Sequence, residues 1–269
     1  MLSIGDRIFA GVFYTCFLFV FIVLGFAAEL YREYQFWLIF GSVFFFSVSL
    51  LYFGSAGSRL KELPPMLDDD CDPVRYIQVV DALMRRPIVG RHFNSALVIH
   101  LSIGYIENGE GDKAIDLLEN ALKNGLKRRN YRGAAHSILC IVYLKKKDTE
   151  SAMAHYEKIK NARSTRYTRK LVKDLDFVLT LEQVPPKEVI DHKQKVLSES
   201  ANRLERAHAH YLIAKAYKEL GDSEKEKEHL EYVAENGNLL HIARLAREKL
   251  GLPQPPEIVQ DSKTLSCEK

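Results

Sequence analysis

Residues 1–57 differ from the rest of the chain in their pattern of apolar and polar positions. One uncharged run covers residues 8–28 and a second covers residues 36–53, with a short charged segment between them. At 1.5 Å per residue the first run is long enough to cross a hydrocarbon core of about 30 Å, and the second is near the short end of the spanning range. Tyr31, Tyr34 and Trp37 cluster at the turn, as in an interfacial aromatic belt. This pattern predicts a two-helix transmembrane hairpin over residues 1–57.

A cleaved signal peptide or a buried core helix is the alternative interpretation of the first run. The run is longer than the apolar region of a signal peptide, and a second uncharged run follows it at once. Arg7, Arg59 and Lys61 flank the two runs and favour both chain termini, together with the repeat domain, on the cytoplasmic side. The widely spaced cysteines agree with a reducing compartment. We therefore expect an integral membrane protein with two spans, in contact with the lipid bilayer through residues 8–53.

Residues 58–72 are predicted to be an acidic linker. The segment contains Pro64 and Pro65, and four aspartates lie between residues 68 and 72. A calcium site is the alternative, but the glycine and the final glutamate of a calcium loop are missing. Asp72 followed by Pro73 predicts the start of a helix, with the aspartate as N-cap and the proline in the first turn.

Beyond residue 73 the apolar residues recur at helical spacing, in pairs of segments that repeat along the chain. One set is Leu101, Tyr105, Gly109, Ala114, Leu118 and Ala121, and 38 residues later it returns as Leu139, Tyr143, Lys147, Ala152, Tyr156 and Ile159. A third set follows after two further periods of 37, at Ile213, Tyr217, Gly221, Glu226, Leu230 and Val233. Because the gap before the third set is two periods long, one degenerate unit fits between the second and third sets.

These residues resemble the tetratricopeptide repeat (TPR), in which a leucine and an aromatic residue lie on a first helix, a glycine at the turn, and small residues on a second helix. The tryptophan usual on the first helix is replaced by Val98, His136 and His210, and the spacing is 37–38 residues instead of 34. The resemblance implies an all-α solenoid over residues 73–251. Its expected parts are units at 95–128, 133–166, 167–203 (degenerate) and 207–240, a closing helix at 239–250 and a disordered tail at 252–269.

In the TPR family the first helices line a concave groove that binds protein segments. Carried over position by position, the groove residues here are Ile99, Ile103, Ile106, Ser137, Ile141, Leu144, Tyr211, Lys215 and Lys218. The lysine and asparagine that bind a carboxylate in some members are absent, because Ile99 and Ile103 occupy those places. The groove is therefore expected to take an amphipathic helix or an apolar extended segment. The alternative is that the chain's own Pro73 helix or its tail fills the groove.

Basic residues gather near the turns between units. They are Lys127, Arg128, Arg129, Arg132, Arg166, Arg169 and Lys170. One edge of the solenoid can therefore contact anionic lipid headgroups, and the alternative is a solvated face without a ligand. No nucleic-acid partner is expected, because the net charge is only +3 and stacking aromatic residues are sparse.

The sequence contains no cluster of residues that indicates catalysis. A phosphate-binding glycine loop, Cys-x-x-Cys, His-Glu-x-x-His and Gly-x-Ser-x-Gly are all absent, and His208 and His210 point to opposite sides of their helix. We expect no enzymatic activity, no cofactor and no metal. The sequence predicts a membrane-tethered TPR scaffold or adaptor, which binds a protein or peptide segment in its groove at the cytoplasmic membrane surface. The alternative is a regulatory or assembly subunit of a membrane enzyme or transport complex, whose hairpin also binds the spans of its partner.

Overall fold

The computed structural model describes residues 41–44, 46–47, 62–85, 91–126, 128–162, 165–180, 183–199 and 202–255, and all regular structure in them is α-helical. The predicted all-α class is therefore confirmed for these residues. The chain divides into two compact units, residues 1–61 and 62–269. The described helices include none that is both long enough and apolar enough to cross a bilayer. Apart from 41–44 and 46–47, the spans predicted at 8–28 and 36–53 lie outside the described residues.

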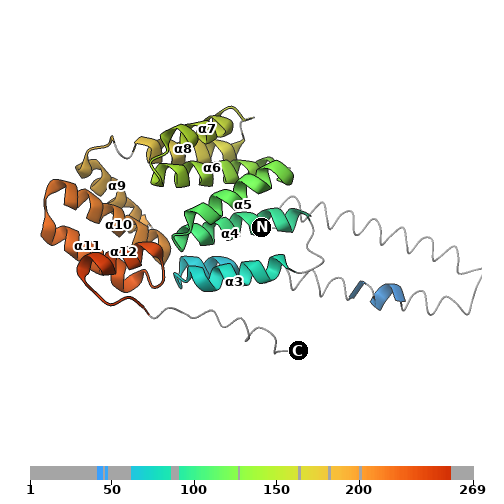
Figure 1. Cartoon of the computed structure of the whole chain (residues 1–269), viewed down its shortest axis with the longest axis horizontal. Coiled ribbons are helices and arrows are strands. Elements are labelled where there is room, and N and C mark those ends of the chain that lie inside the picture. Colours follow the sequence, from blue (N-terminus) through green and yellow to red (C-terminus); the bar gives the residue numbers. More distant parts are fainter. Residues whose placement is uncertain are drawn as a thin grey trace, which may run out of the picture. The chain divides into compact units, whose positions relative to one another are not determined.

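The second unit is a succession of helices joined by short turns (Figure 1). After a helical stretch at 62–68 the helices are α3 (Pro73–Met84), α4 (Arg91–Glu107), α5 (Gly111–Asn124), α6 (Arg129–Lys145), α7 (Thr149–Lys160), α8 (Arg166–Thr180), α9 (Pro186–Glu199), α10 (Arg203–Leu220), α11 (Ser223–Asn236) and α12 (His241–Leu250). The helix pairs α4–α5, α6–α7 and α10–α11 correspond to three of the units expected from the sequence, and α12 corresponds to the closing helix.

The turns inside the helix pairs follow from a few residues at equivalent positions. Gly109, Lys147 and Gly221 each adopt a positive φ, of 84°, 62° and 75°, which ends the first helix. Asp148 and Asp222 then cap the second helix, and their carboxylates accept backbone hydrogen bonds from the residues three positions ahead. The φ and ψ of the two aspartates agree within one degree, so the same turn recurs in the two pairs.

Each pair packs its two helices together, and first helices also pack on one another, α4 on α6, α6 on α8 and α10 on α12. Leu118, Ala135 and Leu139 form the core between α5 and α6. Cys140, Ile159 and Leu175 form the core of α6, α7 and α8. Burying one such leucine or isoleucine contributes about 1.5–3 kcal/mol. All these clusters are made from residues of the second unit.

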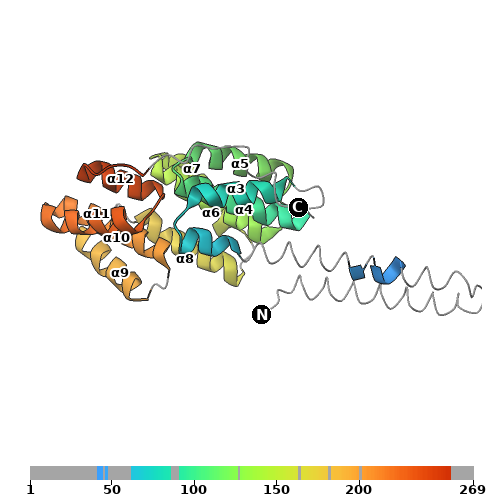
Figure 2. The ribbon, with the colours of Figure 1, turned by 90° about the horizontal axis from the view of Figure 1, so that it is seen from below.

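The helices of the degenerate unit do not form a packed pair. In the described residues α8 packs on α6 and α7, whereas α9 packs on α10, where Val189 and Ile190 lie against Ile213. Figure 2 shows α9, α10, α11 and α12 as one group. The helix series therefore consists of two groups, and the chain passes from one to the other between α8 and α9.

Residues 62–72, the second part of the predicted linker, are folded. Residues 62–68 are helical, and Leu63, Leu67 and Cys71 are buried. Leu63 and Leu67 are four residues apart and so lie on one face of this helical stretch. The start of α3 agrees with the prediction, since the Asp72 side chain accepts a hydrogen bond from the Arg75 amide and proline occupies the first turn.

Candidate functional site

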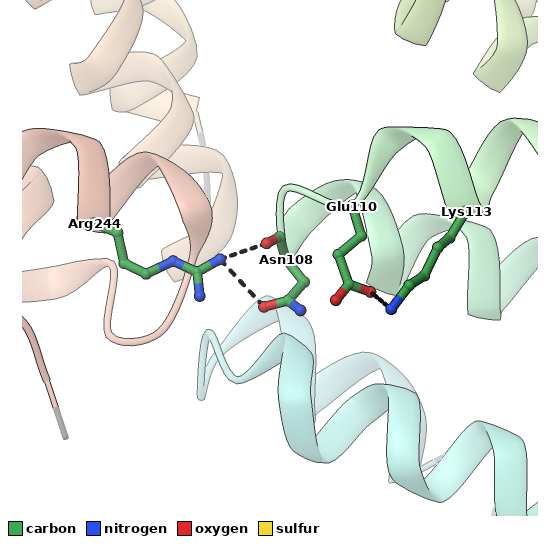
Figure 3. Close-up of polar contacts among 4 residues, drawn as sticks. All are labelled: Asn108, Glu110, Lys113 and Arg244. Atoms are coloured by element: carbon green, nitrogen blue, oxygen red, sulfur yellow. Dashed lines mark hydrogen bonds and ion pairs between the residues drawn. The ribbon is translucent and has the colours of Figure 1, made fainter. Parts of the chain in front are cut away.

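The end of α4 makes polar contacts with α10 and α12 at the other end of the helix series, which the sequence pattern did not indicate. The guanidinium of Arg244, on α12, donates hydrogen bonds to the backbone carbonyl of Asn108 and to its Oδ1, the second at 3.2 Å (Figure 3). Asn108 follows the last residue of α4, where backbone carbonyls lack partners within the helix. A cation is favourable at this end of the helix dipole. Arg244 thus caps α4 from the far end of the chain.

A part-buried histidine–glutamate pair lies next to this cap. His208 Nε2, on α10, is 2.8 Å from Glu107 Oε2, and the Glu107 side chain is only 14% exposed. Burial alone would raise the pKa of Glu107, but His208, which also hydrogen-bonds to the carboxylate, acts together with Lys145 and His241 to hold the pKa below its ordinary value. Glu107 is therefore a carboxylate whose charge depends on contacts from the other end of the helix series. We call the contact of Glu107 and Asn108 with His208, His241 and Arg244 the end contact.

A third segment, residues 70–71, is hydrogen-bonded to the turn that precedes α12, next to the end contact. Asn238 Nδ2 donates to the Asp70 carbonyl at 2.8 Å, and the Leu239 amide donates to the Cys71 carbonyl at 3.2 Å. Cys71 and Asn238 both adopt positive φ, so each backbone turns sharply where the segments touch. Burial raises the pKa of the Cys71 thiol to about 11, which makes it a poor target for thiol reagents.

The predicted groove residues fall into two classes. Ile99 packs against the α5–α6 core, Ile141 and Leu144 pack against the core shared with α8, and Ser137 is buried. By contrast, Lys215 and Lys218 are exposed, while Ile103, Ile106 and Tyr211 are half-buried. Their assignment to a partner-binding groove stays a prediction.

One face of α4 is covered by the chain's own α3. Tyr76 and His100 share a hydrogen bond of 2.6 Å between the hydroxyl and Nδ1. A carbon placed on Gly104 would lie only 2.8 Å from Ile77 Cγ1, so the two helices approach closely because this residue is glycine. The Pro73 helix named above as an alternative occupant therefore packs against α4.

The predicted headgroup-contacting residues are brought together from two segments. Arg128, Arg129 and Arg132 lie at the start of α6, whereas Arg166, Arg169 and Lys170 lie at the start of α8, and all six are exposed. Lys127 lies outside the described residues.

Two pairs of histidines form a repeated cluster that sequence reasoning missed. His136 Nδ1 lies 2.9 Å from His155 Nδ1, and two repeat periods later His210 Nδ1 lies 2.8 Å from His229 Nδ1. One ring of each pair must donate and the other accept, so the accepting ring is neutral. Burial, together with the neighbouring imidazole, lowers the pKa of His136 and of His210 to about 4.

A tyrosine completes each cluster. Tyr143 stacks on His155 and Tyr217 on His229, both with ring centroids 5.6 Å apart. The signal was present in the sequence, because all three positions of the cluster recur together after two repeat periods, whereas nothing in the sequence pairs Glu107 with His208. The described residues contain no group of three potential metal ligands.

No family model, no curated protein and no solved structure matches this chain.

Proposed function

We propose that this protein is a membrane-tethered scaffold of TPR-like helix pairs, which binds a protein segment along its first helices at the cytoplasmic face of a membrane. Residues 1–57 provide the anchor as a hairpin with spans at 8–28 and 36–53, and residues 62–251 provide the repeat domain. Both termini lie in the cytoplasm. No catalytic step belongs to this function.

The observation that supports the proposal most is the recurrence of one helix-pair geometry. Turn residues with positive φ recur in α4–α5, α6–α7 and α10–α11, and the aspartate caps and histidine–tyrosine clusters recur in the last two of these pairs. Stacked repeats of one unit present long surfaces with regularly placed side chains, a property suited to binding extended partners. Exposed Val43 (52%) and Phe44 (64%), on the helical residues 41–44, suit an apolar environment for the anchor.

The binding face can be tested by photo-crosslinking in native membranes. A photoreactive amino acid replaces Lys215 or Lys218, which are exposed on the first helix α10, and in matched controls it replaces Glu224 or Glu228, exposed on the second helix α11. We expect discrete adducts from α10 and none from α11. Equal adducts from both helices, or none from α10, would contradict binding along the first helices.

The anchor and its topology need a separate test, because buried Cys71 and Cys140 are unsuitable for labelling. Cys16 and Cys267 are replaced by serine, and Lys218→Cys adds one exposed thiol. We expect this thiol to react with a membrane-impermeant reagent only after cells are permeabilised. Labelling in sealed cells would move the repeat domain to the outer side, and release of the protein by alkaline carbonate would refute the anchor itself.

A further inference from the structure

We propose that the first turns of α6 and α8 form a single surface that binds the headgroups of anionic phospholipids. The surface is called the basic surface below, and it consists of Arg128, Arg129, Arg132, Arg166, Arg169 and Lys170. The inference deepens the proposed function and rests on it at one point, since the membrane anchor is what brings this surface close to a bilayer.

The basic surface exists because α6 and α8 pack side by side at their starts. A carbon placed on Gly133 would lie 3.5 Å from Leu171 Cδ1 and 3.9 Å from Tyr167 Cε1. Both distances are ordinary van der Waals separations, so the first turn of α8 lies in contact with the first turn of α6. Two basic segments that are separate in sequence become one patch, on which all six side chains are exposed.

Within the described residues, the six basic side chains are not used in ion pairs that stabilise the fold. Among the ion pairs of the described part of the chain, none involves any of the six residues. Neither α6 nor α8 has an acidic residue in its first turn, and the same holds for α3, α4 and α12, whereas α5, α7, α9, α10 and α11 each have at least one. Cations at the start of a helix oppose its dipole. The six charges therefore remain available to an external anion.

The neighbouring side chains favour a lipid surface over a nucleic acid. Tyr167 is 39% exposed next to the basic residues, and an amphipathic ring of this kind suits the headgroup region. Beside it, only Tyr131 could stack on bases, which is too little for single-stranded RNA. The second predicted span ends at residue 53, and the extended chain from there to residue 62 reaches at most about 30 Å. The anchor therefore keeps the repeat domain within reach of headgroups at high effective concentration.

The first experiment uses the full chain in nanodiscs made of phosphatidylcholine alone or with phosphatidylserine as roughly a third of the lipid. Amide hydrogen exchange is compared for the starts of α6 and α8, with α11 as internal reference. We expect exchange at α6 and α8 to slow several-fold only in discs with phosphatidylserine, and this protection to vanish at about 0.5 M salt, where charges are screened. Equal exchange in both discs would overturn the proposal, as would protection by poly(U) RNA or an acidic peptide but not by phosphatidylserine.

The second experiment uses residues 62–269, whose core clusters are complete without the anchor, in sedimentation with vesicles of the same two compositions. Arg129→Glu with Arg166→Glu reverses two charges at helix starts, where glutamate favours the helix. Lys187→Glu with Lys195→Glu makes the same charge change on exposed positions of α9.

We expect the first pair to lower partitioning onto phosphatidylserine vesicles by more than about tenfold and the second pair to lower it by less than about threefold. Equal losses would show that only net charge matters and would overturn the specific surface. Because this arm lacks the anchor, failure of the full chain to enter nanodiscs would refute the anchor alone.

Discussion

The helix pairs α6–α7 and α10–α11 have the same interior but different surroundings. Both contain a hydrogen-bonded histidine pair with a stacked tyrosine, a residue with positive φ at the turn and an aspartate cap. Their first helices differ at equivalent positions, where α6 has half-buried Ile141 and Leu144 and α10 has exposed Lys215 and Lys218. The interior of a repeat is thus set locally, whereas the role of its outer positions depends on which helix lies against them.

The difference has a structural cause. Ile141 and Leu144 contact the core that includes Leu175 of α8. The corresponding neighbour of α10 is α12, and at its start α10 instead pairs His208 with Glu107 of the first helix pair. The position equivalent to His208 in α6 is Ala134, which cannot form such an ion pair. The pair α6–α7 therefore packs on α8 and carries half of the basic surface, whereas α10–α11 forms part of the end contact.

Among substitutions that compare the two helix pairs, a change at Ile141 should have the largest effect on stability. Ile141→Glu places a carboxylate against an apolar core, so we expect a loss of about 2–4 kcal/mol in the free energy of unfolding. Lys215→Glu, at the equivalent but exposed position, should change it by less than about 0.5 kcal/mol. Urea titration of residues 62–269 measures both. Little loss from Ile141→Glu would mean that this side chain is free to serve as groove surface, as the sequence predicted.

Loss of the end contact should have the second largest effect on stability. His208→Ala leaves the Glu107 carboxylate buried without its partner, so we expect a loss of about 1–3 kcal/mol. Glu107→Gln in the same chain should recover part of that loss, because the buried charge is then gone. A double-mutant cycle measures the coupling between the two residues. A coupling near zero would show that the first and last helix pairs do not depend on each other for stability.

The histidine clusters should make the stability of both pairs depend on pH in the same way. The folded pKa of His136 and of His210 is about 4, below the ordinary value of 6.5. The unfolded chain therefore takes up protons first, and stability that is complete above pH 6.5 is lost as the pH falls toward 4. Because water partly screens the clusters, we expect about 1 kcal/mol per cluster instead of the full shift.

Charged side chains on the helices of the two pairs also contribute to these pKa values. Arg132 and Lys158 lower the pKa of His136, Arg206 lowers that of His210, and Glu228 raises that of His229. Urea titrations at pH 7 and pH 5 should give a smaller difference for His136→Gln and for His210→Gln than for the wild type. If only one of the two substitutions reduces the difference, the two clusters are not equivalent.

Substitutions at the turns inside the helix pairs should change the stability of the domain least. Lys147 adopts a φ of 62° where the other two pairs have glycine, so Lys147→Gly removes backbone strain and should stabilise the domain by about 0.5 kcal/mol. Gly221→Ala introduces the same strain and should cost about 1 kcal/mol, with no clash because nothing lies within 4 Å. Thermal melts of both variants compare the turns directly. A destabilising Lys147→Gly would show that its side chain is needed there.

Much of the fold was predictable because it depends on residues close together in the sequence. The helical period, the turn residues and the Asp72 cap all act within four residues, so the all-α class and the order of the three packed pairs follow from the pattern. The limits do not, because the pairs begin at Arg91, Arg129 and Arg203 and not at the predicted 95, 133 and 207. The folding of residues 62–68 was missed, since prolines and aspartates obscure the short apolar spacing of Leu63 and Leu67. Of the candidate site, the basic residues were identified from the sequence, but the packing of α8 on α6 that brings them together was not.

The sequence by itself determined the repeat unit, because its period, caps and internal clusters are encoded at short and regular separations. Only the tertiary structure decided that α8 and α9 belong to different groups and that Arg244 caps α4 across 136 residues. Contacts of this kind depend on the summed rotation between successive helix pairs, which no single segment encodes. Complementary pairs such as Glu107 and His208 are recognisable only once that rotation has brought them within hydrogen-bond distance.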